Sequence, residues 1–270
     1  MSVVRVTVCE LPHEAAALDL AWDGLCHHTS GHGSELVLLP EFAFVEPVWE
    51  TDRFDPARWD AAVELCAAWL GRLSELRAKH VVGSRPVTVD GRPFNQGFIW
   101  SAGGGLRPLR NKFFLPDEPG FREAQWFDRG DATFPAFRAG GLTFGLNICT
   151  ELWALESYAG YAAKEVPVIL SPRATAAATT AKWLSVGVVA AVRSGAFSLS
   201  SNRVDPTGAC GGVGWIICPE GRILARTSPV APFATANIDL AVAAAARDGY
   251  PRYVFKTPSR LSADIPGRSA

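Results

Sequence analysis

Glu35-Leu36-Val37-Leu38-Leu39-Pro40-Glu41 is the stretch of sequence that decides the fold. Its Leu-Val-Leu-Leu centre is an uninterrupted apolar run, which is typical of a strand that is buried on both faces of a sheet. Residues 143–148 form a second apolar run of this kind, and that run ends directly before Cys149. Strands of this kind need cover on both sides, so the sequence predicts a layered α/β protein.

Helical and strand patterns mix throughout the chain around these two strands. Residues 12–28 and 55–79 predict helices, and Asp55-Pro56 is a typical start for the second of them. Further helices are expected at 153–164, 179–193 and 241–247. Further strands are expected at 3–8, 81–89, 94–101, 105–114, 167–170, 196–201, 212–218, 223–227 and 233–238. There is no repeat or obvious linker, so we predict one domain over residues 1–250. Residues 251–270, which carry three prolines, are predicted to be a C-terminal arm or tail.

The composition excludes several classes of function. The 270 residues are 48% hydrophobic, which is enough for one substantial core. The 26 basic and 27 acidic side chains leave a net charge of −1, so nucleic acid and anionic membranes are not expected as partners. No apolar run approaches the roughly 18 residues that span a bilayer. The N-terminus lacks a signal-peptide layout. The six cysteines are scattered without a C-x-x-C pair, which indicates reduced thiols and a cytoplasmic protein.

Three polar residues stand where predicted strands end: Glu41, Lys112 and Cys149. Functional groups in open α/β sheets gather beyond the carboxyl ends of the strands, so these three are expected to converge. A thiolate is a nucleophile, a nearby carboxylate can take its proton, and an ammonium group stabilises an oxyanion. The backbone N–H of Thr150, at a strand-to-helix turn, is a candidate second oxyanion donor.

Each of these residues also has an ordinary structural interpretation: a buried thiol, a loop carboxylate and a surface lysine. Other chemistries find less support. All five histidines lie within the first 80 residues, so no histidine follows Cys149 as in papain-like enzymes. There is no G-x-S-x-G turn and no glycine-rich phosphate loop. For Cys26-His27-His28-Thr29-Ser30-Gly31-His32 we favour a polar loop after a helix over a metal site.

The segments around the three residues resemble the motifs of the nitrilase superfamily of carbon–nitrogen hydrolases. Leu38-Leu39-Pro40-Glu41-Phe42 looks like the family's Glu motif, and Asn111-Lys112-Phe113-Phe114-Leu115-Pro116 looks like its Lys motif. Gly145-Leu146-Asn147-Ile148-Cys149-Thr150-Glu151 looks like its Cys motif. The three occur in the family's order and near its usual spacings, and weaker matches extend the resemblance over about residues 3–250.

The resemblance implies a four-layer α-β-β-α sandwich that pairs helix to helix into a homodimer, without a metal or an organic cofactor. It also implies that Glu123 is a second glutamate, which orients Lys112 and the substrate; Glu118 competes for that role. Two departures stand out. Phe114 replaces the usual histidine of the Lys motif, and Thr150-Glu151 replaces the usual pair after the cysteine.

Residues 116–130 are closest to the amidase and N-carbamoyl-amine amidohydrolase branches. Arg173 is expected either to clamp a substrate carboxylate or to pair with Glu151 or Glu156. Phe42, Trp126 and Trp153 are the expected walls of the substrate pocket, because they adjoin the motifs.

The leading hypothesis is hydrolysis of a linear amide or an N-carbamoyl amine through a Cys149 thioester. The alternatives are a nitrilase acting on a nitrile, an acyltransferase with an acceptor other than water, and a binding protein without catalysis. The three residues do not separate the leading hypothesis from the nitrilase, because both routes pass through a covalent intermediate on the cysteine, and the acyltransferase also stays open. The intact set of three argues against the binding protein.

Overall fold

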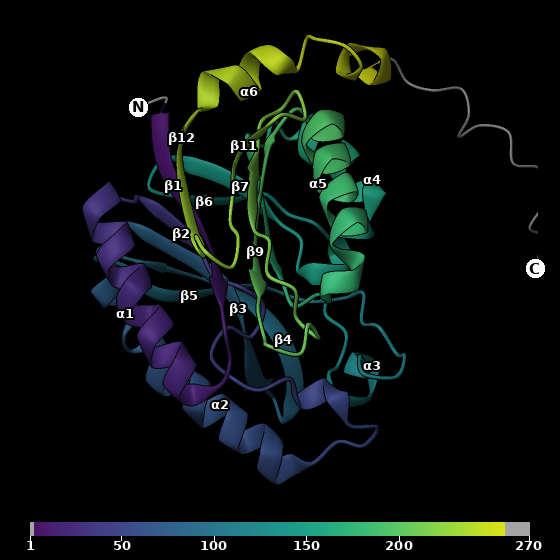
Figure 1. Cartoon of the computed structure of the whole chain (residues 1–270). Helices are drawn as coiled ribbons and strands as arrows, with labels where there is room; N and C mark the ends of the chain where they lie inside the picture. Colours follow the sequence, from purple (N-terminus) through teal and green to yellow (C-terminus); the bar gives the residue numbers. More distant parts are fainter. Residues whose placement is uncertain (1–2, 257–270) are drawn as a thin grey trace, which may run out of the picture.

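The structure, a computed structural model, describes residues 3–256 (Figure 1). Its α-helices are α1 (Ala15–His32), α2 (Pro56–Leu70), α3 (Glu123–Trp126), α4 (Leu155–Ala163), α5 (Thr180–Ser194) and α6 (Leu240–Ala246). Its strands are β1 (Val3–Leu11), β2 (Leu36–Leu38), β3 (His80–Val89), β4 (Arg92–Ser101), β5 (Gly105–Asn111), β6 (Phe137–Ala139), β7 (Leu142–Leu146), β8 (Val168–Arg173), β9 (Phe197–Arg203), β10 (Trp215–Ile217), β11 (Ile223–Arg226) and β12 (Phe233–Asp239). Short 3-10 turns are η1 (Val48–Glu50), η2 (Leu73–Leu76), η3 (Cys149–Trp153), η4 (Ala177–Thr179) and η5 (Arg252–Lys256).

Nine strands of the described residues form two packed halves of one hydrogen-bonded path, in the order β5-β4-β3-β2-β1-β9-β8-β7-β6. Off this path, β10 pairs with β9 and β11, and β12 pairs with β1. Strands β1–β2–β3 are parallel in one half, and β7–β8–β9 are parallel in the other. The halves join where β1 pairs with β9 through Glu10 with Asn202 and Leu11 with Arg203. Because this junction uses the last residues of both strands, the carboxyl ends of the two parallel sets meet at one place.

Three buried apolar clusters separate four layers of structure. Side chains alternate between the faces of a strand, so Val37 and Leu39 face the helices α1 and α2, whereas Leu36 and Leu38 face the second half of the sheet. A third cluster lies between the second half and the helices α4 and α5, and it includes Tyr161. Figure 1 shows α1 and α2 on one outer side and α4 and α5 on the other. The predicted four-layer α-β-β-α sandwich is therefore confirmed.

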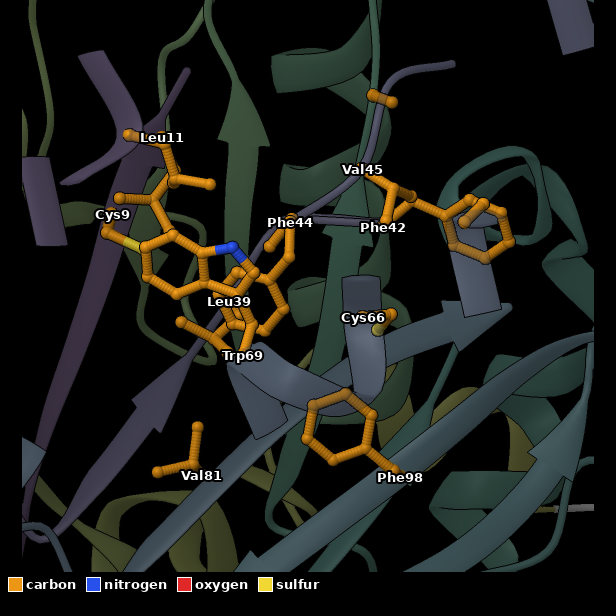
Figure 2. Close-up of a cluster of buried hydrophobic side chains, with 14 of the residues drawn as sticks. Cys9, Leu11, Leu39, Phe42, Phe44, Val45, Cys66, Trp69, Val81 and Phe98 are labelled. Carbon is orange, nitrogen blue, oxygen red and sulfur yellow. The ribbon is translucent and has the colours of Figure 1, made fainter. Parts of the chain in front are cut away.

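The cluster under α1 and α2 gathers the large aromatic side chains of the first half. Figure 2 shows Val81 and Phe98 of the sheet facing the same interior as Cys66 and Trp69 of α2. Phe42, just after the strand β2, also lies in this interior. The predicted buried strand is thus covered on its outer face by a packed aromatic layer, which holds the start of the Glu41 segment rigidly.

Close approach of the two halves depends on a glycine in β4. A Cβ atom at Gly97 would lie 2.3 Å from Cδ2 of Leu146 at the end of β7. A larger residue at position 97 would require the buried Leu146 side chain to move, so Gly97 favours close packing of the strand that precedes Cys149 against β4. The nucleophile segment and the strand next to Lys112 are brought together in this way.

Two element predictions were wrong. The Cys26–His32 segment is the last part of α1, not a loop, and Gly33 ends the helix in the left-handed conformation with φ of 61°. Thr29 within this segment is buried, and its hydroxyl donates to Leu25 O. The helix predicted over 55–79 ends at Leu70. The short turn η2 (Leu73–Leu76) follows, and Arg77 then turns the chain at φ of 51°. Strand β6 was not predicted.

The end of the described chain lies against α5. Arg252 of η5 is buried and donates to the carbonyl oxygens of Val192 and Pro219. The domain boundary at residue 250 stays a prediction, and residues 257–270 of the predicted arm lie outside the described residues. No helix within residues 3–256 combines the length and the apolar character that crossing a membrane requires.

Candidate active site

The three predicted residues lie just beyond the ends of β2, β5 and β7. Glu41 N donates to Arg173 O at 3.2 Å, which ties the end of β2 to the end of β8 across the two halves. Lys112 N donates to Asn95 O at 2.8 Å and so continues the pairing of β5 with β4. The convergence that strand topology predicts is therefore present, and it is built from backbone hydrogen bonds.

The Lys112 ammonium group is the centre of a buried charge cluster. Its Nζ lies 2.8 Å from Oε1 of Glu41, and 2.8 and 2.7 Å from Oε1 and Oε2 of Glu123. All three side chains have at most 2% of their surface exposed. Glu118, the other candidate for the second glutamate, is exposed on the loop and pairs through its backbone with Phe121. The structure thus brings Glu123, and not Glu118, to Lys112.

Burial and the charges of their neighbours shift the pKa values of the groups in this cluster. Burial alone would lower the pKa of Lys112, but the carboxylates of Glu123 and Glu41 together outweigh burial and raise it. Burial raises the pKa of Glu123, and the Glu41 charge adds to that rise, while Lys112 opposes it. The lysine is therefore cationic, whereas the pKa of Glu123 is raised to about 8, so this carboxyl group takes up a proton near neutral pH far more readily than an exposed glutamate.

Glu41 has one oxygen engaged and one oxygen free. Oε1 accepts from Lys112 and from Asn95 Nδ2, the latter at 2.8 Å. Oε2 is buried and has no hydrogen-bond partner among residues 3–256. Buried carboxylate oxygens are normally hydrogen-bonded, so an unpartnered one indicates an atom that receives its partner during function.

The turn after Glu41 is held in an unusual conformation. Phe42 has φ of 45°, in the left-handed region that bulky residues rarely adopt. Its N–H donates to Ser84 Oγ at 3.4 Å, and Arg203 Nη1 donates to its carbonyl at 3.1 Å. Arg203 is fully buried. Strain of this kind persists only where neighbours enforce it, and here it directs the Glu41 side chain toward Lys112.

Cys149 occupies a second left-handed turn, between β7 and η3. Its φ is 50°, and its side chain is buried apart from a small surface on a cavity. Its Sγ lies 4.0 Å from Ala174 O. Burial raises the pKa of the thiol well above its usual value, the negative charges of Glu41 and Glu123 raise it further, and Lys112 opposes them. The resting group is therefore a thiol, and a base is needed to use it as a nucleophile.

Glu151 joins the cysteine turn to the lysine strand. Its Oε1 accepts from Arg110 Nη2 at 3.0 Å and from Phe113 N at 2.8 Å. Its Oε2 accepts from Ile148 N at 3.0 Å and from Arg110 Nη1. Ile148 precedes Cys149, and Arg110 and Phe113 flank Lys112. One buried carboxylate thus sets the position of the thiol relative to the ammonium group.

A small cavity of about 140 Å³ reaches this cluster. Its lining includes Cys149, Thr150, Glu123, Phe121, Ala174 and Trp183. Thr150 therefore lies where its backbone was expected, next to the thiol. Within residues 3–256 there is no group of three or more His, Cys, Asp or Glu side chains arranged to hold a metal ion.

The structure places the four predicted substrate-binding side chains away from that lining. Phe42 and Trp126 are in the core under α1 and α2, and Trp126 Nε1 donates to Thr51 O. Trp153 is 46% exposed and its ring packs on Trp183, so it supports the wall from outside.

Arg173 is buried but does not meet the cavity or a carboxylate. Its guanidinium donates to Ser200 Oγ, Thr175 Oγ1 and Val213 O, and it lies 4.1 Å from the centroid of the Trp215 ring. The expected pairing with Glu151 or Glu156 is absent within residues 3–256, since Glu151 pairs with Arg110. Burial lowers the pKa of Arg173 to about 9.

Asn95 and Trp183 are the site residues that the sequence analysis missed. Asn95 interrupts an apolar strand with a buried polar side chain, which is a signal that a polar partner lies opposite. Trp183 lies in the first turns of α5 and has no local signal, because its contact with the cavity depends on how α5 packs.

Comparison with known proteins decides the family. The Carbon-nitrogen hydrolase family matches residues 5–248 of this chain. The chain belongs to the carbon–nitrogen hydrolase family. The resemblance to the nitrilase superfamily that the three motifs indicate is thereby confirmed. Family membership supports an enzyme that hydrolyses carbon–nitrogen bonds.

Individual relatives of this carbon–nitrogen hydrolase are distant. N-carbamoylputrescine amidase from Oryza sativa subsp. japonica is 31% identical over 81 residues, which cover 30% of this chain and only 27% of that relative's length. A carbon-nitrogen hydrolase from Helicobacter pylori G27 superposes with a TM-score of 0.84 at 20% identity, covering 99% of this chain and 100% of that one. An amidase mutant from Nesterenkonia sp. AN1, with acrylamide added to its active-site cysteine, gives 0.71 at 17% identity, covering 94% and 98%. These structural likenesses show the shared fold.

Proposed function

We propose that this carbon–nitrogen hydrolase cleaves linear amides or N-carbamoyl amines through a thioester on Cys149. The observation that carries the proposal is the free, buried Oε2 of Glu41 in a cluster with Lys112, beside a thiol whose pKa is raised. Such a thiol is inert without a base, and Glu41 is a base with an open acceptor. The partial match to an N-carbamoylputrescine amidase supports amides and carbamoyl amines as the substrate class.

In the acylation half, Cys149 Sγ attacks the carbonyl carbon while its proton passes to Oε2 of Glu41. The carbonyl oxygen becomes an oxyanion, which accepts from Lys112 Nζ and from the backbone N–H of Thr150. Lys112 has three N–H donors, and two of them are directed at Glu123 in the resting site. The oxyanion takes over one of these two, and Glu123 keeps the other. Glu41 then returns the proton to the nitrogen as the carbon–nitrogen bond breaks, and ammonia or an amine leaves.

In the deacylation half, water occupies the place of the departed amine. Glu41 removes a proton from this water, whose oxygen attacks the thioester carbon. The second oxyanion uses the same two donors. The carbon–sulfur bond breaks, Sγ takes the proton from Glu41, and the acid leaves. No step requires a metal or an organic cofactor, because the chain supplies the nucleophile, the base and the oxyanion donors.

The test is ammonia release by the purified protein from a panel of primary amides, N-carbamoyl amines and nitriles. We expect turnover of at least one amide or carbamoyl amine, with kcat lowered by at least about 10³ in Cys149→Ala. Cys26→Ala is the matched control, because Cys26 is a half-buried thiol of α1. Intact-mass analysis of the acylated protein is expected to place the acyl group on Cys149.

Full activity in Cys149→Ala, or acylation of another cysteine, would contradict the proposal. Turnover confined to nitriles would replace the proposed substrate class while leaving the nucleophile in place.

We further propose that two copies pair through the outer face of α4 and α5. Leu155, Val189 and Phe255 are 50%, 45% and 56% exposed on α4, α5 and the adjoining η5, and Phe255 packs on Arg193 of α5. Sedimentation equilibrium of the wild type and of Val189→Glu tests this, with a dimer expected for the first and a monomer for the second. A cytoplasmic location remains a prediction from the scattered cysteines.

A further inference from the structure

A second and much larger chamber adjoins the Cys149 cavity. Its volume is about 1060 Å³, against about 140 Å³ for the cavity itself. Its walls come from the start of α1, from η1 and from the loop after β9, and they are mainly apolar, with Pro47, Trp49, Phe121, Val204 and Cys210 among them. Ligand sites are typically hollows of this size with apolar walls and a few polar groups.

The chamber and the cavity share part of their walls. Phe121, Ala174 and Ala176 line both. The carbonyl of Ala174 is also the group that Cys149 Sγ approaches. A molecule that presents a carbonyl to the thiol therefore has a short path, past two alanines, from the cavity into the chamber.

The small cavity alone sets a limit on the substrate. A volume of about 140 Å³ holds an amide group and a few further atoms, and the chamber is the adjoining space for a larger group of the substrate. An apolar group in contact with Trp49 and Phe121 is removed from water there, which contributes to binding in proportion to the area buried.

The charged groups around the chamber are of one sign. Its lining includes the acidic side chains of Glu14, Glu50 and Asp205, and also the imidazole of His13. Among residues 3–256 no lysine or arginine lines the chamber or the Cys149 cavity. Arg203 precedes the lining residue Val204 and has no exposed surface. Its Nη1 donates to Phe42 O, and its Nε and Nη2 have no partner within residues 3–256. A carboxylate entering the chamber would therefore meet three acidic side chains, mainly apolar surface, and His13, whose pKa is lowered by burial.

We infer that the chamber is the binding site for the part of the substrate that does not react, and that this part is bulky, mainly apolar and not anionic. This inference rests on the proposed function and narrows it to a substrate class. A neutral or cationic far end fits the chamber, whereas an amide that carries a carboxylate at its far end does not.

A series of primary amides tests the size and polarity of the group. The purified full chain is assayed for ammonia release from acetamide, butanamide, hexanamide and octanamide. We expect kcat/KM to rise about three- to fourfold per added methylene until the chamber is filled, which is the fold-change equivalent of about 0.8 kcal/mol per buried methylene. A flat series, or one in which acetamide is the best substrate, overturns the inference.

Charge is tested at constant length. Octanamide is compared with 8-aminooctanamide and with 7-carboxyheptanamide. The carboxylate compound is expected to react at least about thirtyfold more slowly than octanamide, and the ammonium compound at least as fast as octanamide. Equal rates for the carboxylate compound and octanamide overturn the inference.

Variants separate the chamber from the rest of the protein. Glu50→Gln is expected to lower the ratio of kcat/KM between the ammonium and carboxylate amides at least threefold. Ala209→Trp, which fills the chamber, is expected to lower the ratio of kcat/KM between octanamide and acetamide at least tenfold. Glu46→Gln is the matched control, because Glu46 is exposed near Glu50 and points to Arg58. If neither Glu50→Gln nor Ala209→Trp changes its ratio of rates from the wild-type value, the inference is overturned. If no amide of any length acylates Cys149, it is the proposed function that has failed.

Discussion

Replacing Glu151 with glutamine is the sharpest test of how the site is held together. The Glu151 carboxylate is fully buried and accepts four hydrogen bonds, two from Arg110 and one each from the N–H groups of Phe113 and Ile148. Glutamine has almost the same shape but only one acceptor oxygen, and its NH₂ group must face at least one of these donors. The charge that balances the buried guanidinium of Arg110 is also lost.

The structure sets the size of the effect. Removing one partner of a buried ion pair costs about 3–5 kcal/mol of unfolding free energy, because a buried charge is left unpaired. Arg110 keeps its bonds to Thr133 O and Asp131 O and its stacking on Phe134, so we expect the lower part of that range, about 3 kcal/mol. In a chain of this size the melting temperature should fall by roughly 6–12 °C.

Activity should fall as well, because the same carboxylate fixes the thiol relative to Lys112. We expect kcat to drop about 10- to 100-fold at a temperature where the variant remains folded, with KM changed less than about threefold.

The assays are thermal unfolding followed by circular dichroism, and steady-state ammonia release well below the melting temperature. Glu156→Gln is the control, since Glu156 is exposed in α4 only five residues away and should leave both quantities unchanged. A Glu151→Gln protein that melts within about 2 °C of this control, with wild-type kcat, would refute the reasoning. It would mean that the turn around Cys149 is held by its own packing and not by the bridge to Arg110.

Three further predictions concern the charge cluster and the cavity wall. Glu123→Gln removes an acidic group that raises the pKa of Cys149, so alkylation of the thiol by iodoacetamide at pH 8 should become faster. Amide turnover should fall about 10²-fold, because Lys112 loses a partner that orients it. Slower alkylation would contradict this prediction. The difference in ultraviolet absorbance between wild type and Cys149→Ala should show no thiolate below pH 9, because the pKa of Cys149 is raised and the thiolate appears only as pH rises through that pKa; a step near pH 7 would indicate a resting ion pair with Lys112. Trp183→Ala should raise KM at least fivefold and Trp153→Ala less than twofold, since Trp183 lines the cavity and Trp153 only packs on it. A larger rise in KM for Trp153→Ala than for Trp183→Ala would instead make Trp153 the wall.

The layers of the fold could be predicted because their signals are local. The run Leu36–Leu39 alternates between two apolar interiors, and an apolar strand without polar positions has no other stable environment. The positions of Glu41, Lys112 and Cys149 follow from the same logic, because strand direction alone brings the ends of parallel strands together. These predictions needed only the period of the pattern and the topology of parallel strands.

The substrate-binding side chains could not be predicted in this way. Phe42 and Trp126 adjoin the motifs in sequence, but the left-handed turn at Phe42 sends its ring into the core. Arg173 was expected to need an anion, yet neutral oxygens and the face of Trp215 satisfy it. Adjacency in sequence does not determine side-chain direction where the backbone turns sharply, and both turns of this site are such places.

The charge balance of the cluster explains why a buried, protonated thiol suits this chemistry. At rest, Lys112 is paired with Glu41 and Glu123, and burial together with these acidic groups keeps Cys149 protonated. When the proton moves from Sγ to Oε2 of Glu41, the total charge of the cluster stays the same, and the negative charge moves from the carboxylate to the sulfur and then to the oxyanion. Lys112 contacts Glu41 at the start and the oxyanion at the end, so its charge is close to the negative charge throughout. In a buried site, moving a charge next to a fixed cation costs far less than creating one, because few water molecules need to reorient. The cost of burying these ions is therefore met on folding, through contacts such as the one between Glu151 and Arg110, and not in the reaction itself.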